Sequence, residues 1–148
     1  MTKPVRIILV DDHALIRETW RMLLQNTPGF EVAGDCGTGL EAIELMREAR
    51  PDIMLLDINM FPLNGYDIAE KAAELFPEIK VVGLSVNNKP KYAVRLVEMG
   101  AKGYLTKSSS MDEIRHGIEE VYKGNFYICE EIISSISAGE PMTGKTLT

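Results

Sequence analysis

The order of apolar segments along the chain limits its fold more than any other feature of the sequence. Five short apolar runs recur at intervals that leave room for a helix and its loops: VRIILV (5–10), FEVAG (30–34), DIMLLD (52–57), KVVGLS (80–85) and KGYLTK (102–107). Most of these runs lack the alternation of apolar and polar residues that marks a strand with one face in water. They therefore predict strands that are buried on both faces.

The segments between these runs carry signals for the start and the end of helices. In SMDEIRHGIEEVYKG, Ser110 and Glu113 form a capping box and Gly124 ends the helix. Thr38 and Glu41 form the same box at the start of TGLEAIELMREARP. Alternating strands and helices predict an α/β fold, because the connections between parallel strands cover both faces of the sheet. We therefore expect a doubly wound, five-stranded parallel sheet with helices on both faces.

The bulk properties of the chain exclude several classes of protein. With 148 residues, 45% of them hydrophobic, the chain is long enough for one soluble domain with a real core. Its net charge of −6 argues against binding of nucleic acid by this chain alone, since such binding needs clustered Lys and Arg. Two aspartates interrupt the first apolar run, so we expect no signal peptide, and we expect no membrane segment. Cys36 and Cys129 lack metal-ligand spacing, which favours reduced, packed thiols in a cytoplasmic protein.

Polar residues follow the predicted strands at the edge where ligands bind in an open parallel sheet. The first run ends in Asp11 and Asp12, the third in Asp57 and the fourth in Ser85, and the fifth leads to Lys107. Three converging carboxylates repel one another unless a cation lies among them, and Mg²⁺ binds such oxygens together with those of a phosphate. A lysine and a hydroxyl suit a phosphoryl group, and a carboxylate can be the nucleophile that forms an aspartyl phosphate.

Four ordered motifs, LVDDH (9–13), MLLDINM (54–60), GLS (83–85) and GYLTK (103–107), resemble those of bacterial two-component response regulator receiver domains. The resemblance covers residues 5 to about 124. It implies a flavodoxin-like sheet with the strand order 2-1-3-4-5. It also implies that Asp57 is the phosphoacceptor and that Asp11, Asp12, Asp57 and the backbone oxygen of Asn59 hold Mg²⁺.

The same resemblance assigns the remaining polar residues to a switch that catalyses only its own phosphorylation and dephosphorylation. Ser85 and Lys107 would bind the phosphoryl oxygens, and Tyr104 would be the aromatic residue whose rotamer follows the state of Ser85. The phosphoryl group would come from a sensor histidine kinase. The chain is therefore expected to be a signalling protein of two-component systems rather than a metabolic enzyme.

The segments VDDHALIRE and MGAKGYLTK and the residues after Gly124 are most similar to those of regulators that carry a LuxR-type helix-turn-helix output domain. We expect a receiver domain over residues 1–124, an appended short helix over 125–138 and a linker over 139–148 toward a DNA-binding domain absent from this chain. The Leu147–Thr148 pair resembles the opening of that output domain. Transcription control and homodimer formation on phosphorylation are the corresponding expectations.

One residue departs from the pattern of the resembled family. Phe61 stands four positions after Asp57, where proline is usual, and Pro62 follows it. Proline fixes φ and restricts the residue before it, so this shift should alter the turn beside the site, although Phe61 could simply cap the pocket.

Two glycine motifs suggest a different function. GTGLEA (37–42) fits the relaxed dinucleotide fingerprint, and GEPMTGKT (139–146) fits the phosphate-loop pattern, so a nucleotide-binding enzyme is one alternative. Against the second motif, the segment before it has helical spacing and not that of a strand. A receiver that acts alone by docking to another protein is the other alternative.

Overall fold

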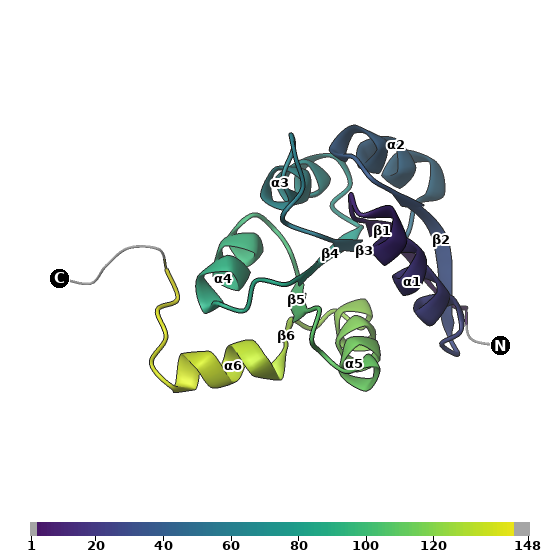
Figure 1. Cartoon of the computed structure of the whole chain (residues 1–148). Helices are drawn as coiled ribbons and strands as arrows, with labels where there is room; N and C mark the ends of the chain where they lie inside the picture. The colour runs from purple at the N-terminus through teal and green to yellow at the C-terminus, as the bar shows by residue number, and fades with distance from the viewer. Residues whose placement is uncertain (1–2, 144–148) are drawn as a thin grey trace.

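The computed structural model describes residues 3–143, which form a parallel sheet with helices on both faces (Figure 1). The strands are β1 (Val5–Val10), β2 (Phe30–Cys36), β3 (Ile53–Leu56), β4 (Lys80–Ser85), β5 (Gly103–Thr106) and β6 (Tyr127–Ile128). The helices are α1 (Ala14–Gln25), α2 (Gly39–Ala49), α3 (Gly65–Leu75), α4 (Pro90–Glu98), α5 (Met111–Tyr122) and α6 (Glu130–Ser137).

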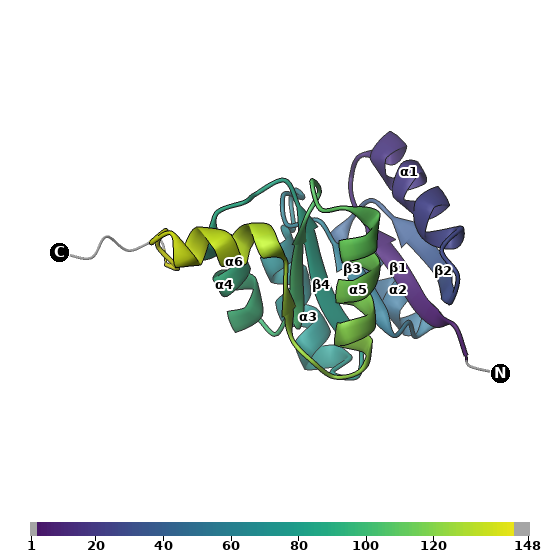
Figure 2. The same cartoon turned by 90° about the horizontal axis from the view of Figure 1, so that it is seen from below.

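The strands are all parallel and follow the order 2-1-3-4-5-6, so the expected order of the first five is confirmed. Helices α1 and α5 cover one face, and α2, α3 and α4 cover the other (Figures 1 and 2). The strand order reverses between β1 and β3, which places the expected ligand crevice at the carboxyl ends of these two strands.

The segment after α5 differs from the helix expected over residues 125–138. Tyr127 and Ile128 form a sixth strand, and the helix begins only at Glu130. The N–H groups of Tyr127 and Cys129 donate to the carbonyls of Lys102 and Tyr104, at 3.1 and 3.0 Å. These bonds give partners to backbone groups on the edge of β5 that would otherwise lack them. The helical spacing of the apolar residues in this segment does not reveal such tertiary bonds.

Local helix signals agree with the structure in part. The hydroxyls of Thr38 and Ser110 accept hydrogen bonds from the N–H groups of Glu41 and Glu113, which is the N-cap half of each predicted capping box. The return half is replaced by other bonds, since the Glu41 carboxylate accepts the hydroxyl of Thr38 and the Glu113 carboxylate accepts the hydroxyl of Tyr127. Gly124 follows α5 with φ of +104°, a left-handed conformation in which glycine has no steric penalty.

Both cysteines are free and buried, as the expectation of packed thiols predicted. Burial is the largest cause that raises the pKa of Cys36, to about 11, so this thiol is protonated at neutral pH. Among residues 3–143, no helix is long and apolar enough to cross a membrane.

Candidate functional site

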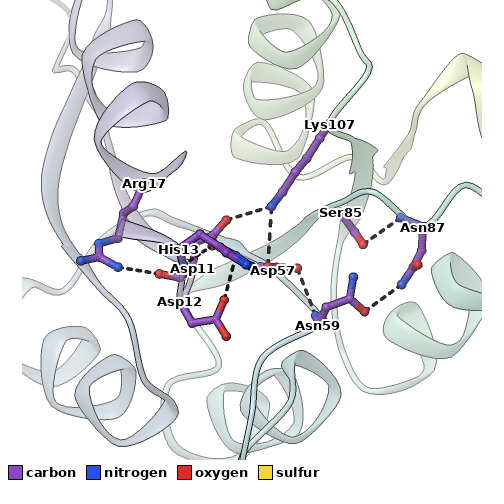
Figure 3. Close-up of polar contacts among 9 residues, drawn as sticks. All are labelled: Asp11, Asp12, His13, Arg17, Asp57, Asn59, Ser85, Asn87 and Lys107. Carbon is purple, nitrogen blue, oxygen red and sulfur yellow. Dashed lines mark hydrogen bonds and ion pairs between the residues drawn. The ribbon is translucent and has the colours of Figure 1, made fainter. Parts of the chain in front are cut away.

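The acidic residues predicted from the sequence meet at the carboxyl ends of β1 and β3 (Figure 3). The backbone N–H of Asp57 donates to the carbonyl of Val10 at 2.9 Å, and that of Asp11 donates to Cys36 at 3.1 Å. These bonds continue the strand pairing by one residue and fix where both side chains point. The loop after Asp57 ends at Gly65, which packs against the backbone of Ile58. This position needs glycine, because a Cβ there would lie 2.4 Å from the Cα of Ile58.

Four ligand-type side chains form one cluster in this crevice. Carboxylate oxygens of Asp11, Asp12 and Asp57 and a ring nitrogen of His13 all lie within 4.8 Å of one another. Asp57 is 4% exposed and Asp11 is also buried, whereas Asp12 and His13 face solvent. Three carboxylates open to water on one side are the oxygen ligands that Mg²⁺ prefers, so the donor set fits this ion.

Lys107 supplies the positive charge inside the cluster. Its Nζ lies 2.9 Å from Oδ2 of Asp11 and 3.6 Å from Oδ2 of Asp57. Burial is the largest effect on Asp57 and raises the pKa of its carboxyl, an effect that the N–H of Asn59 and the charge of Lys107 oppose. The neighbouring charges of Asp11 and Asp12 raise that pKa further.

The predicted switch residues form a connected group beside the acidic cluster. The backbone N–H of Asn87 donates to Oγ of the buried Ser85 at 3.1 Å. The side-chain amide of Asn87 donates to Oδ1 of Asn59 at 3.0 Å. Tyr104 is fully buried, and its hydroxyl donates to the carbonyl of Asn87 at 2.7 Å. Burial raises the pKa of Tyr104, so its hydroxyl is a donor at neutral pH.

Every residue predicted for the site lies in or beside this pocket, including Asn59, whose N–H donates to Oδ1 of Asp57 at 3.0 Å. Sequence reasoning missed Arg17 and Asn87. Arg17 donates to the carbonyl of Asp11 at 2.7 Å and to Oδ1 of Asp35 at 2.8 Å. A charged residue in an amphipathic helix gives no signal of such a role, whereas Asn87 could have been suspected from its place two residues after Ser85.

The glycine motifs lack the surroundings that nucleotide binding needs. In GTGLEA, Thr38 caps α2, and the preceding strand is the edge strand β2. Asp35 and Arg17 form an ion pair beside this loop, which puts a carboxylate where a pyrophosphate would approach. GEPMTGKT follows α6 and not a strand, and its last three residues, like Leu147–Thr148, lie outside the described residues.

Phe61 does not cover the pocket, since it is 85% exposed. Its peptide bond to Pro62 is cis.

Comparison with known proteins identifies relatives of the same kind. Residues 7–119 match the response regulator receiver domain. The transcriptional regulatory protein DegU of Brevibacillus brevis is 33% identical over 132 residues, which are 89% of this chain and 56% of that protein. The response regulator GacA of Pseudomonas aeruginosa is 32% identical over 133 residues, 90% of this chain and 62% of GacA. The chain thus spans about 60% of the length of these relatives.

A solved structure agrees with the sequence matches. A two-component response regulator of the LuxR family from Aurantimonas superposes with a TM-score of 0.87 at 29% identity, covering 92% of this chain and 97% of that one. The match over residues 7–119 includes every strand end that builds the acidic pocket, from Asp11 after β1 to Lys107 after β5. The chain therefore belongs to the response regulator receiver domain family, within the group of LuxR-type regulators.

Proposed function

We propose that the chain is a phosphorylation-operated switch in which Asp57 accepts a phosphoryl group from a sensor histidine kinase. The observation that carries this proposal is the position of Asp57. It is buried at the end of β3 with Lys107 3.6 Å away, and it faces Asp11 and Asp12 across the pocket. The experiment is incubation with acetyl phosphate and Mg²⁺, followed by mass spectrometry. One added phosphoryl group per chain is expected, and none would contradict the proposal.

In the transfer, an oxygen of Asp57 attacks the phosphorus of the partner's phosphohistidine, and the bond from phosphorus to the imidazole nitrogen breaks. The N–H of Asn59 and the charge of Lys107 favour the ionised form of the buried carboxylate, which is the form that acts as a nucleophile. Lys107 then lies within reach of the phosphoryl oxygens and offsets their charge. Mg²⁺, held by Asp11, Asp12, Asp57 and the backbone oxygen of Asn59, would supply further charge neutralisation.

The switch step follows from the bonds around Ser85. Its hydroxyl turns to donate to a phosphoryl oxygen, while its Oγ already accepts the N–H of Asn87. The carbonyl of Asn87 in turn accepts the hydroxyl of Tyr104. The buried ring of Tyr104 is the inward position that we assign to the phosphorylated state, and an outward ring belongs to the resting state. The ring thus changes the surface formed by α4, β5 and α5, so a local charge event biases a two-state element.

We extend the proposal to the whole protein. The relatives named above are longer than this chain, and they are regulators by name. A DNA-binding domain after the linker at 139–148 would let phosphorylation control transcription, through a change in how two chains associate. Such a protein would act in the cytoplasm. The gene itself decides between this arrangement and a stand-alone receiver: an open reading frame beyond Thr148 supports the former, and a stop codon there supports the latter.

Exposed apolar side chains lie in the segments that leave the carboxyl ends of three strands, and they suit a partner that must approach Asp57. Leu15, Phe61 and Val86 lie in the segments that follow β1, β3 and β4, and each is more than half exposed. Exposed apolar residues around a reactive site are typical of a protein-binding surface. We infer that the kinase contacts this rim.

Replacing Phe61 with alanine should slow transfer from a phosphorylated kinase about tenfold, because a buried aromatic contact at an interface contributes at least that much. Transfer from acetyl phosphate should stay unchanged, since this small donor reaches Asp57 without contacting the exposed apolar side chains. The rates of the two reactions are measured on the same protein. Phe126→Ala is the matched control, because Phe126 is also exposed, at 60%, but follows α5, and its ring lies under the Nζ of Lys102. Equal losses with both donors would refute the docking role.

A further inference from the structure

Helix α6 brings one carboxylate to the loops that surround the pocket. Oε1 of Glu131, in the first turn of α6, accepts the hydroxyls of Thr106 at 2.7 Å and Ser108 at 2.8 Å. Its Oε2 accepts the side-chain amide of Asn88 at 3.2 Å. One side chain therefore joins the loop after β4 to the loop after β5, and α6 itself lies beside α4 (Figures 1 and 2).

The loop after β4 connects Glu131 to the switch residues. Asn88 directly follows Asn87, whose N–H donates to Oγ of Ser85. The carbonyl of Asn87 accepts the hydroxyl of the inward Tyr104 at 2.7 Å. A shift of this loop would therefore alter the bond to Ser85, the bond to Tyr104 and the bond to Glu131 together.

The end of β5 forms the second connection. Thr106 pairs in register with Ser85, and the N–H of Lys107 donates to the carbonyl of Ser85 at 2.8 Å. The N–H of Cys129, just before α6, donates to the carbonyl of Tyr104 at 3.0 Å. The start of α6 is thus bonded to the switch residue on its backbone and to both loops through Glu131.

The contacts of Glu131 favour its ionised form. The hydrogen bond from Thr106 is the largest effect and lowers the pKa of the Glu131 carboxyl, as does the bond from Ser108; burial opposes them, and the bond from Asn88 adds the smallest lowering. The three donors therefore meet a charged acceptor at neutral pH, and hydrogen bonds to a charged acceptor are stronger than those between neutral groups.

We propose that Glu131 is a positioning residue that couples the docking of α6 to the phosphorylation state of the pocket. By holding Asn88, the carboxylate keeps the loop after β4 where the carbonyl of Asn87 accepts the hydroxyl of the inward Tyr104. The inference rests on the proposed function, in which phosphorylation favours the inward ring. Phosphorylation and the docking of α6 both favour the inward ring of Tyr104, so each strengthens the other by the same factor. Phosphorylation therefore tightens the docking of α6, and residues after α6 receive the signal through this helix.

The test is hydrogen–deuterium exchange of the α6 amides in the whole chain, with and without beryllofluoride and Mg²⁺ as a phosphoryl mimic. In the wild type, the mimic should slow exchange in α6 by about fivefold or more. Glu131→Gln keeps an oxygen that accepts the hydroxyls of Thr106 and Ser108 but presents an NH₂ donor to Asn88. This variant should lose the response to the mimic. If Glu131 were merely structural, exchange would rise equally with and without the mimic, which would overturn the proposal.

Two further variants sharpen the result. Asn88→Ala removes the same hydrogen bond from the other side and should also abolish the response, with no further loss in the double variant Glu131→Gln/Asn88→Ala. Glu130→Gln makes the same charge change at an exposed neighbour and should respond as the wild type does. A wild type that binds beryllofluoride without slower α6 exchange overturns the coupling and leaves the proposed function intact. A wild type that does not bind beryllofluoride overturns both.

Discussion

Replacing Asp57 with asparagine should abolish phosphorylation of the chain by acetyl phosphate, with a loss of at least about 10³-fold in rate. The amide has no free carboxylate oxygen to attack phosphorus, and the nearest other carboxylates cannot replace it. Asp11 is engaged by Lys107 at 2.9 Å, and Asp12 faces solvent at the rim. The measurement is intact mass after reaction in the presence of Mg²⁺.

The matched control for this variant lies at the other end of the same strand. Asp52 precedes β3, and its Oδ2 accepts the N–H of Arg6 at 2.9 Å, a bond that an asparagine oxygen can keep. Asp52→Asn should gain one phosphoryl group as the wild type does. An Asp57→Asn protein that still gained the phosphoryl mass would show that another residue is the acceptor.

The Asp57→Asn variant should be more stable than the wild type when Mg²⁺ is absent. The pKa of Asp57 is raised in the folded protein, so the folded state binds a proton more tightly than the unfolded state does. The stability contributed by that proton is complete below the unfolded pKa and is lost as pH rises through the folded value. Because burial disfavours the ionised carboxylate and an amide carries no charge, the melting temperature of the wild type should lie about a few degrees below that of Asp57→Asn.

Most of the fold could be predicted because its signals are local. The fourth strand and the caps at Thr38 and Ser110 lie where the sequence placed them. The sixth strand could not be predicted, since Tyr127 and Ile128 are extended only because the edge of β5 offers them backbone partners. Tertiary hydrogen bonds of this kind leave no periodic pattern in the sequence.

Helix α1 shows the same limit for packing. Its apolar residues recur at helical spacing, yet only Leu24 is fully buried, while Leu15 and Met22 are largely exposed. Periodicity reports that a helix has an apolar side and does not report whether this chain covers it.

The pocket could be predicted as a set of residues, because the carboxyl ends of parallel strands bring Asp11, Asp57 and Lys107 together whatever the loops do. The hydrogen bonds that connect the pocket to the rest of the protein could not be predicted. The bonds of Asn87 and Glu131 depend on loop conformation and on where α6 begins, and both are set by contacts between segments distant in sequence. The motifs therefore indicate the chemistry, whereas the path by which the chemistry reaches the rest of the protein has to be read from the structure.

Removing the Asp12 carboxylate should abolish the Mg²⁺ dependence of phosphorylation and slow the reaction about 10²-fold at millimolar Mg²⁺. Without Asp12, the ion loses the ligand that faces solvent, and the remaining negative charge on Asp11 and Asp57 is balanced by Lys107 alone. Trp20 is the single tryptophan of the chain, and it lines a small cavity together with Asp11 and Asp57, so its fluorescence can follow metal binding directly.

In the wild type, Mg²⁺ should change the Trp20 signal with saturation, and in Asp12→Ala the signal should not change over the same Mg²⁺ concentrations. Asp112→Ala removes a carboxylate from the exposed surface of α5 and should titrate as the wild type does. If Asp12→Ala kept both the fluorescence change and the rate, Asp12 would not hold the metal. Because fluorescence reports binding and mass reports transfer, a loss of rate with binding intact would instead place Asp12 in the chemistry alone.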